Sequence, residues 1–113
     1  MAGVVVQKYG GSSLADADAV RRVARRIAAR RSGGDDVVAV VSAMGERTDE
    51  LTALALEVND RPDRRELDVL LSTGELVSCT LTAMALNALG QPAKSLAGRQ
   101  AGIHTTSRYG RAQ

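Results

Sequence analysis

A lysine, two glycines and two serines stand together near the start of the sequence, in the stretch K-Y-G-G-S-S over residues 8–13. A lysine supplies a point charge for phosphate, and glycines let backbone amides approach phosphate oxygens closely. The order is not that of a Walker A loop, in which the lysine follows the glycines, and it is not G-x-G-x-x-G. The stretch by itself fits a phosphate site and a plain turn with an exposed lysine equally well.

Two later stretches carry polar side chains where an element is expected to begin or end. Ser42 closes an apolar run, and Thr48 stands where it would cap a helix that begins near residue 49. The residues alone favour that capping role for Thr48. Glu75 follows S-T-G at an expected helix start, where a carboxylate either complements the helix dipole or holds a substrate ammonium. Spacing does not decide between these two roles of Glu75.

Other reactive side chains are sparse. His104 is the only histidine and has no Cys/His cluster around it, so we do not expect a zinc site. Cys79 is the only cysteine, which excludes an internal disulfide, and its apolar neighbours predict a small core residue. Six arginines between residues 21 and 31 are more typical of a solvated helix face than of a phosphate or partner surface.

The composition excludes several classes of function. The 113 residues are enough for one domain, and 2% aromatic residues leave too few rings for a base-stacking surface. A net charge of +2 is not the footprint of a nucleic-acid binder. No signal peptide and no run of 18 apolar residues is apparent, so we expect neither a membrane partner nor a membrane span. Together with the single cysteine, this favours a cytoplasmic location.

The chemistry must be positioned by alternating strands and helices. Short apolar runs predict strands, and an apolar spacing of three and four residues predicts helices. Strand, helix and strand within the first 42 residues form a βαβ unit, which favours parallel strands and an α/β fold. We expect strands at 3–9, 36–42 and 92–96, and helices at 16–31, 49–58 and from Pro62, the last interrupted at 72–74 and resumed over 75–89.

Four stretches in this order and spacing resemble the N-terminal part of the catalytic domain of bacterial aspartate kinases, in the wider amino acid kinase family. They are V-V-V-Q-K-Y-G-G-S-S, V-V-A-V-V-S-A-M-G-E-R-T-D-E-L, R-E-L-D-V-L-L-S-T-G-E-L-V-S and S-L-A-G-R-Q-A-G-I-H-T-T-S-R-Y-G-R-A. The resemblance covers essentially the whole chain. It implies that residues 1–113 are part of a three-layer α/β/α sandwich with a largely parallel sheet, incomplete here and without the regulatory ACT domains.

The resemblance also implies an activity. Aspartate kinases use ATP and Mg²⁺ to phosphorylate the side-chain carboxylate of L-aspartate to 4-phospho-L-aspartate, the first step towards lysine, threonine and methionine. The matching positions here are Lys8, which contacts the ATP phosphates as the catalytic lysine, the nucleotide-binding Tyr9, Gly10, Gly11 and Ser12, and the aspartate-holding Ser42, Thr48 and Glu75, the last against the α-ammonium. No metal ligand is matched, because the acidic residues near magnesium are expected beyond this sequence.

Departures and alternatives accompany this interpretation. Ala97 and Arg99 stand where family members often carry Thr and a small polar residue. We expect no activity from these 113 residues alone, since the adenine pocket and the remaining substrate contacts of the family lie beyond them. The alternatives are a non-catalytic module that needs a complementing chain, or an amino acid kinase for another substrate. For the partners of the chain, the resemblance leaves open a homo-oligomer or a complementing chain. The S-A-M-G and S-T-G-E stretches argue against another substrate.

Overall fold

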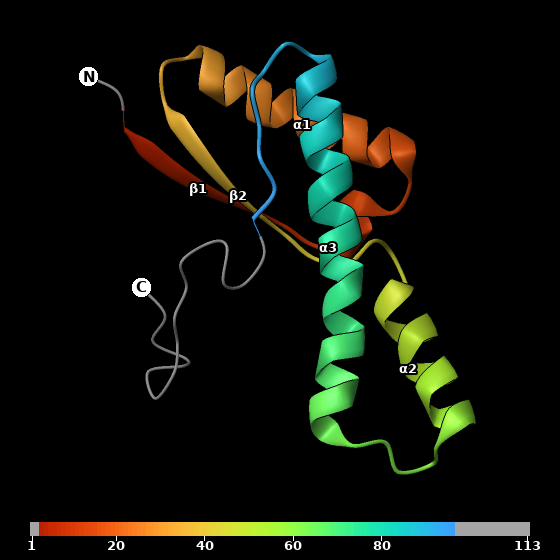
Figure 1. Ribbon diagram of the computed structural model, residues 1–113. Helices are drawn as coiled ribbons and strands as arrows, with labels where there is room; N and C mark the ends of the chain where they lie inside the picture. The colour runs from red at the N-terminus through yellow and green to blue at the C-terminus, as the bar shows by residue number, and fades with distance from the viewer. Residues whose placement is uncertain (1–2, 97–113) are drawn as a thin grey trace.

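The computed structural model describes residues 3–96, which form a small parallel sheet with two long helices packed on one side of it and a shorter helix that packs on one of these beyond the strand ends (Figure 1). The described elements, in chain order, are β1 (Val4–Tyr9), the 3-10 turn η1 (Gly11–Leu14), α1 (Ala17–Ser32), β2 (Asp36–Val41), α2 (Arg47–Val58) and α3 (Arg64–Ala88). His104, Ala97 and Arg99 lie outside the described residues.

The first three predicted elements are confirmed. β1 and β2 pair in parallel, with Val4 opposite Asp36 and Tyr9 opposite Val41, and α1 connects them. The sequence forms strands here because β-branched valines suit a pleated surface, and the chain needs a helical crossover to return in the same direction. The expected α/β class with a parallel sheet is therefore present.

The two faces of the sheet have different surroundings. Val37, Ala39 and Val41 pack against a core formed by buried side chains of η1, α1 and α3. On the other face Val4 and Val38 are 70% and 51% exposed. Within residues 3–96 the sheet is thus covered on one side, which gives two of the three layers that the family resemblance implies.

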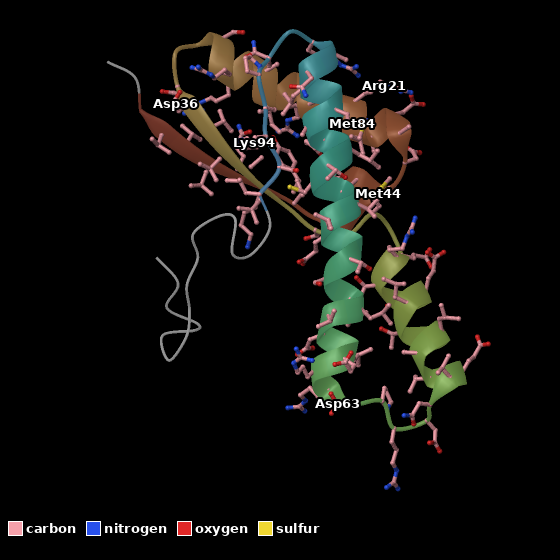
Figure 2. All side chains as sticks on the ribbon, viewed as in Figure 1. Arg21, Asp36, Met44, Asp63, Met84 and Lys94 are labelled. Atoms are coloured by element: carbon pink, nitrogen blue, oxygen red, sulfur yellow. The ribbon has the colours of Figure 1, made fainter. Side chains whose placement is uncertain are left out.

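Helix α1 supplies most of the core. Asp16 caps it, since its Oδ1 accepts a hydrogen bond of 2.8 Å from the amide of Ala19. The apolar residues of the helix recur on one face, and that face is buried (Ala19, Val20, Val23, Ala24 and Ile27). The opposite face carries the arginines; Arg21 is labelled in Figure 2 and bonds to Asp18. This bond and the charge of Arg21 lower the pKa of the Asp18 carboxyl.

Helix α3 is continuous, so the interruption predicted at residues 72–74 is wrong. The hydroxyls of Ser72 and Thr73 donate hydrogen bonds of 2.7 and 2.6 Å to the carbonyls of Val69 and Leu70, and the helix runs on through them. Polar residues of this kind favour turns only where they compete for the backbone, whereas here they bond back onto the helix. Gly74 costs about 1 kcal/mol relative to alanine, which packing offsets.

The third predicted strand, residues 92–96, is not a strand. The amide of Gln91 donates to the carbonyl of Leu86, and the amide of Ala93 donates to Oδ1 of Asn87. Pro92 has no amide hydrogen. The donors at the start of this segment therefore bond to the end of α3 and not to the free edge of β2.

Helix α3 is also the one helix within residues 3–96 that is long and apolar enough to cross a membrane, with a mean hydropathy of 1.5 in its most apolar window. Length and composition alone decide that test, and core helices of soluble proteins pass it too. In the fold the helix contacts α1, α2 and β2. Its buried stripe consists of Gly74, Ser78, Thr82 and Leu86.

Candidate functional site

The end of β1 sends two neighbouring side chains to opposite faces of the sheet. Lys8 pairs with Val40 and is exposed on the uncovered face. Tyr9 packs against the core on the other face, and its hydroxyl donates a 2.9 Å hydrogen bond to Oε1 of Gln7. The charge of Lys8 is thus available to a ligand. The side chain of Tyr9 packs against the core, so only the backbone of Tyr9 borders the following loop.

The loop after β1 is open on its outer side and anchored on its inner side. Gly10 has extended backbone angles (φ −83°, ψ 176°), and a Cβ added to it would meet no heavy atom within 4 Å. Ser12 is exposed. Leu14, at the end of η1, is fully buried in the core. The loop therefore follows a fixed path while one of its sides faces free space.

The loops after β1 and β2 pack directly on each other. A Cβ on Gly11 would lie 3.0 Å from the carbonyl oxygens of both Ala43 and Gly45. The amide of Gly45 donates a 2.9 Å hydrogen bond to the carbonyl of Gly11, and the amide of Ser42 donates one of 3.1 Å to the carbonyl of Tyr9. Gly45 has φ +48°, in the left-handed region. Ser42 thus begins a loop that is bonded to the end of β1.

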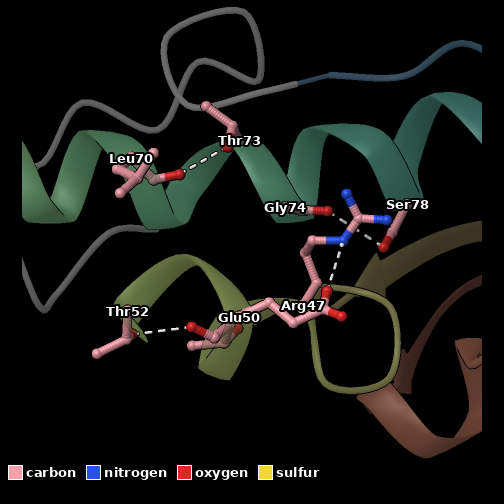
Figure 3. Close-up of polar contacts among 8 residues, drawn as sticks. Arg47, Glu50, Thr52, Leu70, Thr73, Gly74 and Ser78 are labelled. Atoms are coloured by element: carbon pink, nitrogen blue, oxygen red, sulfur yellow. Dashed lines mark hydrogen bonds and ion pairs between the residues drawn. The ribbon is translucent and has the colours of Figure 1, made fainter. Parts of the chain in front are cut away.

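Thr48 is not the helix cap that the sequence predicts. Helix α2 begins at Arg47 with Glu46 as its cap residue, so Thr48 lies within the first turn. Its carbonyl accepts a 2.8 Å hydrogen bond from the hydroxyl of Thr52 (Figure 3). The helix starts early because the amide of Arg47 already bonds to the carbonyl of Met44, which leaves the side chain of Thr48 exposed and without a capping bond.

Glu75 is exposed and lies within α3, so the prediction that it stands at a helix N-terminus is wrong. A dipole-complementing role is excluded, because the helix dipole acts only on the first and last turns. The preceding residue, Gly74, is buried against Ala43, and a Cβ added to it would lie 3.3 Å from Cγ of Arg47; Figure 3 shows Gly74 and Arg47. Arg47 also pairs with Glu50, with Nε 3.5 Å from Oε1.

Close packing brings together the loop after β1, the loop after β2 and the part of α3 around Gly74. Ala43 contacts the Gly11 position through its carbonyl and the Gly74 position through its side chain. Sequence reasoning named Gly11 but missed Ala43, Gly74 and Leu14 as positioning groups. For Ala43 and Gly74 the available signal was their small size within a polar stretch, because small residues permit close backbone approach. Within residues 3–96 no three His, Cys, Asp or Glu side chains could jointly hold a metal ion.

Comparison with known proteins identifies the family to which this chain belongs. A sequence model of the amino acid kinase family matches residues 3–112. The chain belongs to this family. It is similar to the aspartokinases of Mycobacterium tuberculosis (strain ATCC 25618 / H37Rv) and Corynebacterium glutamicum, with 56% and 54% identity over 110 residues in each case. Those 110 residues are 97% of this amino acid kinase chain and 26% of each relative. The chain thus spans about a quarter of the length of these curated relatives.

A solved structure agrees with the sequence relatives. The crystal structure of aspartate kinase from Synechocystis superposes with a TM-score of 0.84 at 48% identity, over 86% of this chain and 17% of that one. The resemblance inferred from the four sequence stretches is therefore confirmed, and so is the α/β fold with a parallel sheet.

Proposed function

We propose that this chain supplies the phosphate-binding and aspartate-binding edge of an aspartate kinase, which transfers the γ-phosphoryl group of ATP to the side-chain carboxylate of L-aspartate. The product is 4-phospho-L-aspartate, with which the synthesis of lysine, threonine and methionine begins. The proposal extends to this chain the activity for which its aspartokinase relatives are named. It also includes the cytoplasmic location that the sequence predicts.

The observation that carries the proposal is that the fold itself does not require a glycine at position 10. Its backbone angles suit any residue, and the space beside it is open. Neither conformation nor packing therefore requires glycine at this position, in contrast to Gly11, which packs on the next loop. A ligand that must come close to the backbone does require it. The first amides of η1, which follow Gly10, receive no side-chain cap and suit an anion such as phosphate.

In the proposed reaction an oxygen of the aspartate carboxylate forms a bond to the γ-phosphorus, and the bond to the β–γ bridging oxygen breaks. Its electron pair leaves with ADP. Lys8 stabilises the negative charge on the phosphates during transfer, while the amides after Gly10 and the hydroxyl of Ser12 hold the phosphate oxygens. Phosphoryl transfer needs mainly such positioning and charge stabilisation from the protein.

The aspartate side of the site is assigned to Ser42, Thr48 and Glu75. All three are exposed, and the loop and helix that carry them meet at Ala43. Glu75 pairs with the α-ammonium of aspartate, and the two hydroxyls orient the substrate by hydrogen bonds. A carboxylate and an ammonium form the stronger, charge-assisted kind of hydrogen bond, which suits recognition of an amino acid.

Magnesium belongs to the proposed reaction but not to a site built from the described residues. Within the described part of the chain no group of three carboxylate, imidazole or thiol side chains is available to hold a metal ion. Magnesium, when bound with ATP, neutralises phosphate charge. We assign no residue of this chain to it and derive no step through it.

The test is a segment exchange. The matched 110-residue segment of the Mycobacterium tuberculosis aspartokinase, 56% identical, is replaced by residues 3–112 of this chain. Formation of aspartyl hydroxamate is then measured with ATP, magnesium and hydroxylamine. We expect the chimera to phosphorylate aspartate in preference to glutamate, because the exchanged segment carries the proposed aspartate contacts.

The same chimera with Lys8→Ala is the control for background activity. A folded but inactive chimera would refute the proposed function. A chimera that accepts glutamate as well as aspartate would refute the assignment of aspartate specificity to Ser42, Thr48 and Glu75.

A further inference from the structure

The closest approach between α3 and the rest of the site is at Gly74. A Cβ added there would lie 2.9 Å from Cβ of Ala43 and 3.3 Å from Cγ of Arg47. Separations below 3.0 Å essentially never occur for real Cβ atoms, and ordinary contacts begin at 3.4 Å. The Arg47 side chain can rotate away, but the Ala43 methyl group cannot. A side chain at position 74 would thus require the helix or the loop to move by about 0.5 Å or more.

This glycine is not explained by the backbone. Position 74 is in the interior of α3, where glycine is among the poorest helix formers, and its φ angle is not positive. Packing is therefore the reason for it. Ala43, the residue it packs on, is itself only 7% exposed and follows Ser42 directly. The contact thus joins the helix that carries Glu75 to the loop that carries Ser42.

We infer that Gly74 is a positioning residue that sets the distance between Glu75 and the loop from Ser42 to Thr48. The inference rests on the proposed function, since it assigns these three residues to one aspartate molecule. Glu75 is adjacent to Gly74 in the chain, so a displacement of α3 at Gly74 moves the carboxylate with it. Misplacement of a binding group by about 1 Å can lower the rate of a reaction on the order of 100-fold.

The inference predicts a selective loss of aspartate affinity. In the chimera, Gly74→Ala should raise KM for aspartate at least tenfold and change KM for ATP less than twofold, because the three heavy atoms nearest to the new Cβ belong to Ala43 and Arg47 and none belongs to the loop after β1. Ala43→Gly removes the methyl group with which the new Cβ would collide. The double variant should therefore bring KM for aspartate back to within threefold of the Ala43→Gly variant.

Thermal melting of the same variants distinguishes a displaced binding group in a folded protein from a loss of the fold. Alanine is the better helix former, so without a collision Gly74→Ala would raise the melting temperature. If Gly74→Ala prevents folding, the double variant decides: it should fold and bind aspartate like Ala43→Gly. A double variant that also fails to fold would overturn the inference, because the collision would not be with Ala43.

Two kinetic outcomes would also overturn it. One is a Gly74→Ala chimera with KM for aspartate within twofold of the unmodified chimera. The other is an equal increase of KM for aspartate and for ATP, which would indicate a general structural effect. If the unmodified chimera is inactive, the proposed function fails; if it is active and Gly74→Ala changes nothing, this inference alone fails.

Discussion

Replacing Gly10 by alanine should separate stability from nucleotide binding. The new Cβ meets no heavy atom within 4 Å, and φ of −83° suits alanine. The substitution should therefore stabilise the 113-residue chain by about 0.4–1 kcal/mol, because it restricts the unfolded state, and raise the melting temperature by about 2–6 °C. The same Cβ occupies the space that the proposed phosphate needs.

The loss of nucleotide affinity can be given a magnitude. Hydrogen bonds to charged groups contribute about 1.5–3 kcal/mol each. Loss of one such bond between a backbone amide and a phosphate oxygen corresponds to an increase of KM for ATP of about 10- to 150-fold. We would measure KM for ATP in the chimera and thermal melting in the chain itself.

Gly11→Ala is the matched control, since its Cβ would lie 3.0 Å from two backbone carbonyl oxygens and should lower the melting temperature. The reasoning is refuted if Gly10→Ala leaves KM for ATP within twofold of the unmodified value. It is also refuted if Gly10→Ala destabilises the chain as much as Gly11→Ala does.

Four further substitutions, one of them paired with a control substitution, test other parts of the structure. Lys8→Ala should lower kcat/KM of the chimera on the order of 100- to 1,000-fold, because charge stabilisation is lost in the transition state; an unchanged value would remove Lys8 from the site. Glu75→Gln should raise KM for aspartate about tenfold at unchanged KM for ATP, and equal changes in both would contradict the ammonium contact. Leu14→Ala should cost about 2–5 kcal/mol in urea unfolding of the chain, whereas Leu54→Ala, at a side chain 54% exposed, should cost clearly less; equal losses would refute the core described above. Val38→Lys, on the uncovered sheet face, should change the stability of the chain by no more than about 0.5 kcal/mol, and a loss several times larger would show that this face is covered.

The strands and α1 could be predicted because their signals are local. Consecutive valines and a regular apolar spacing depend on neighbours in the sequence, and Asp16 caps the helix with its own side chain. The helix break predicted at residues 72–74 is wrong because the low helix propensity of Ser, Thr and Gly does not account for packing. The hydroxyls of Ser72 and Thr73 bond to carbonyls of their own helix. Glycine at position 74 lowers helix stability, but the close contact with Ala43 requires a small residue there.

The candidate site divides in the same way. Lys8 and Ser42 lie at strand ends as expected, because parallel strands bring their carboxyl ends to one edge. The contact of Gly74 with Ala43 joins residues 31 positions apart, and no pattern in the sequence reports such a distance. Thr48 and Glu75 were assigned to helix starts because the true starts, Arg47 and Arg64, depend on loop bonds and on a cap by Asp63.

The opposite directions of Lys8 and Tyr9 have a consequence for folding fidelity. If β1 slipped by one residue against β2, each side chain would change faces, and Lys8 would enter the apolar space between the sheet and α1. An ammonium group buried there without a partner would cost several kcal/mol. The proposed phosphate-binding charge therefore also penalises a mispaired sheet. A neutral residue at position 8 would remove that protection, so misfolded or aggregated material should be more abundant during refolding of Lys8→Ala.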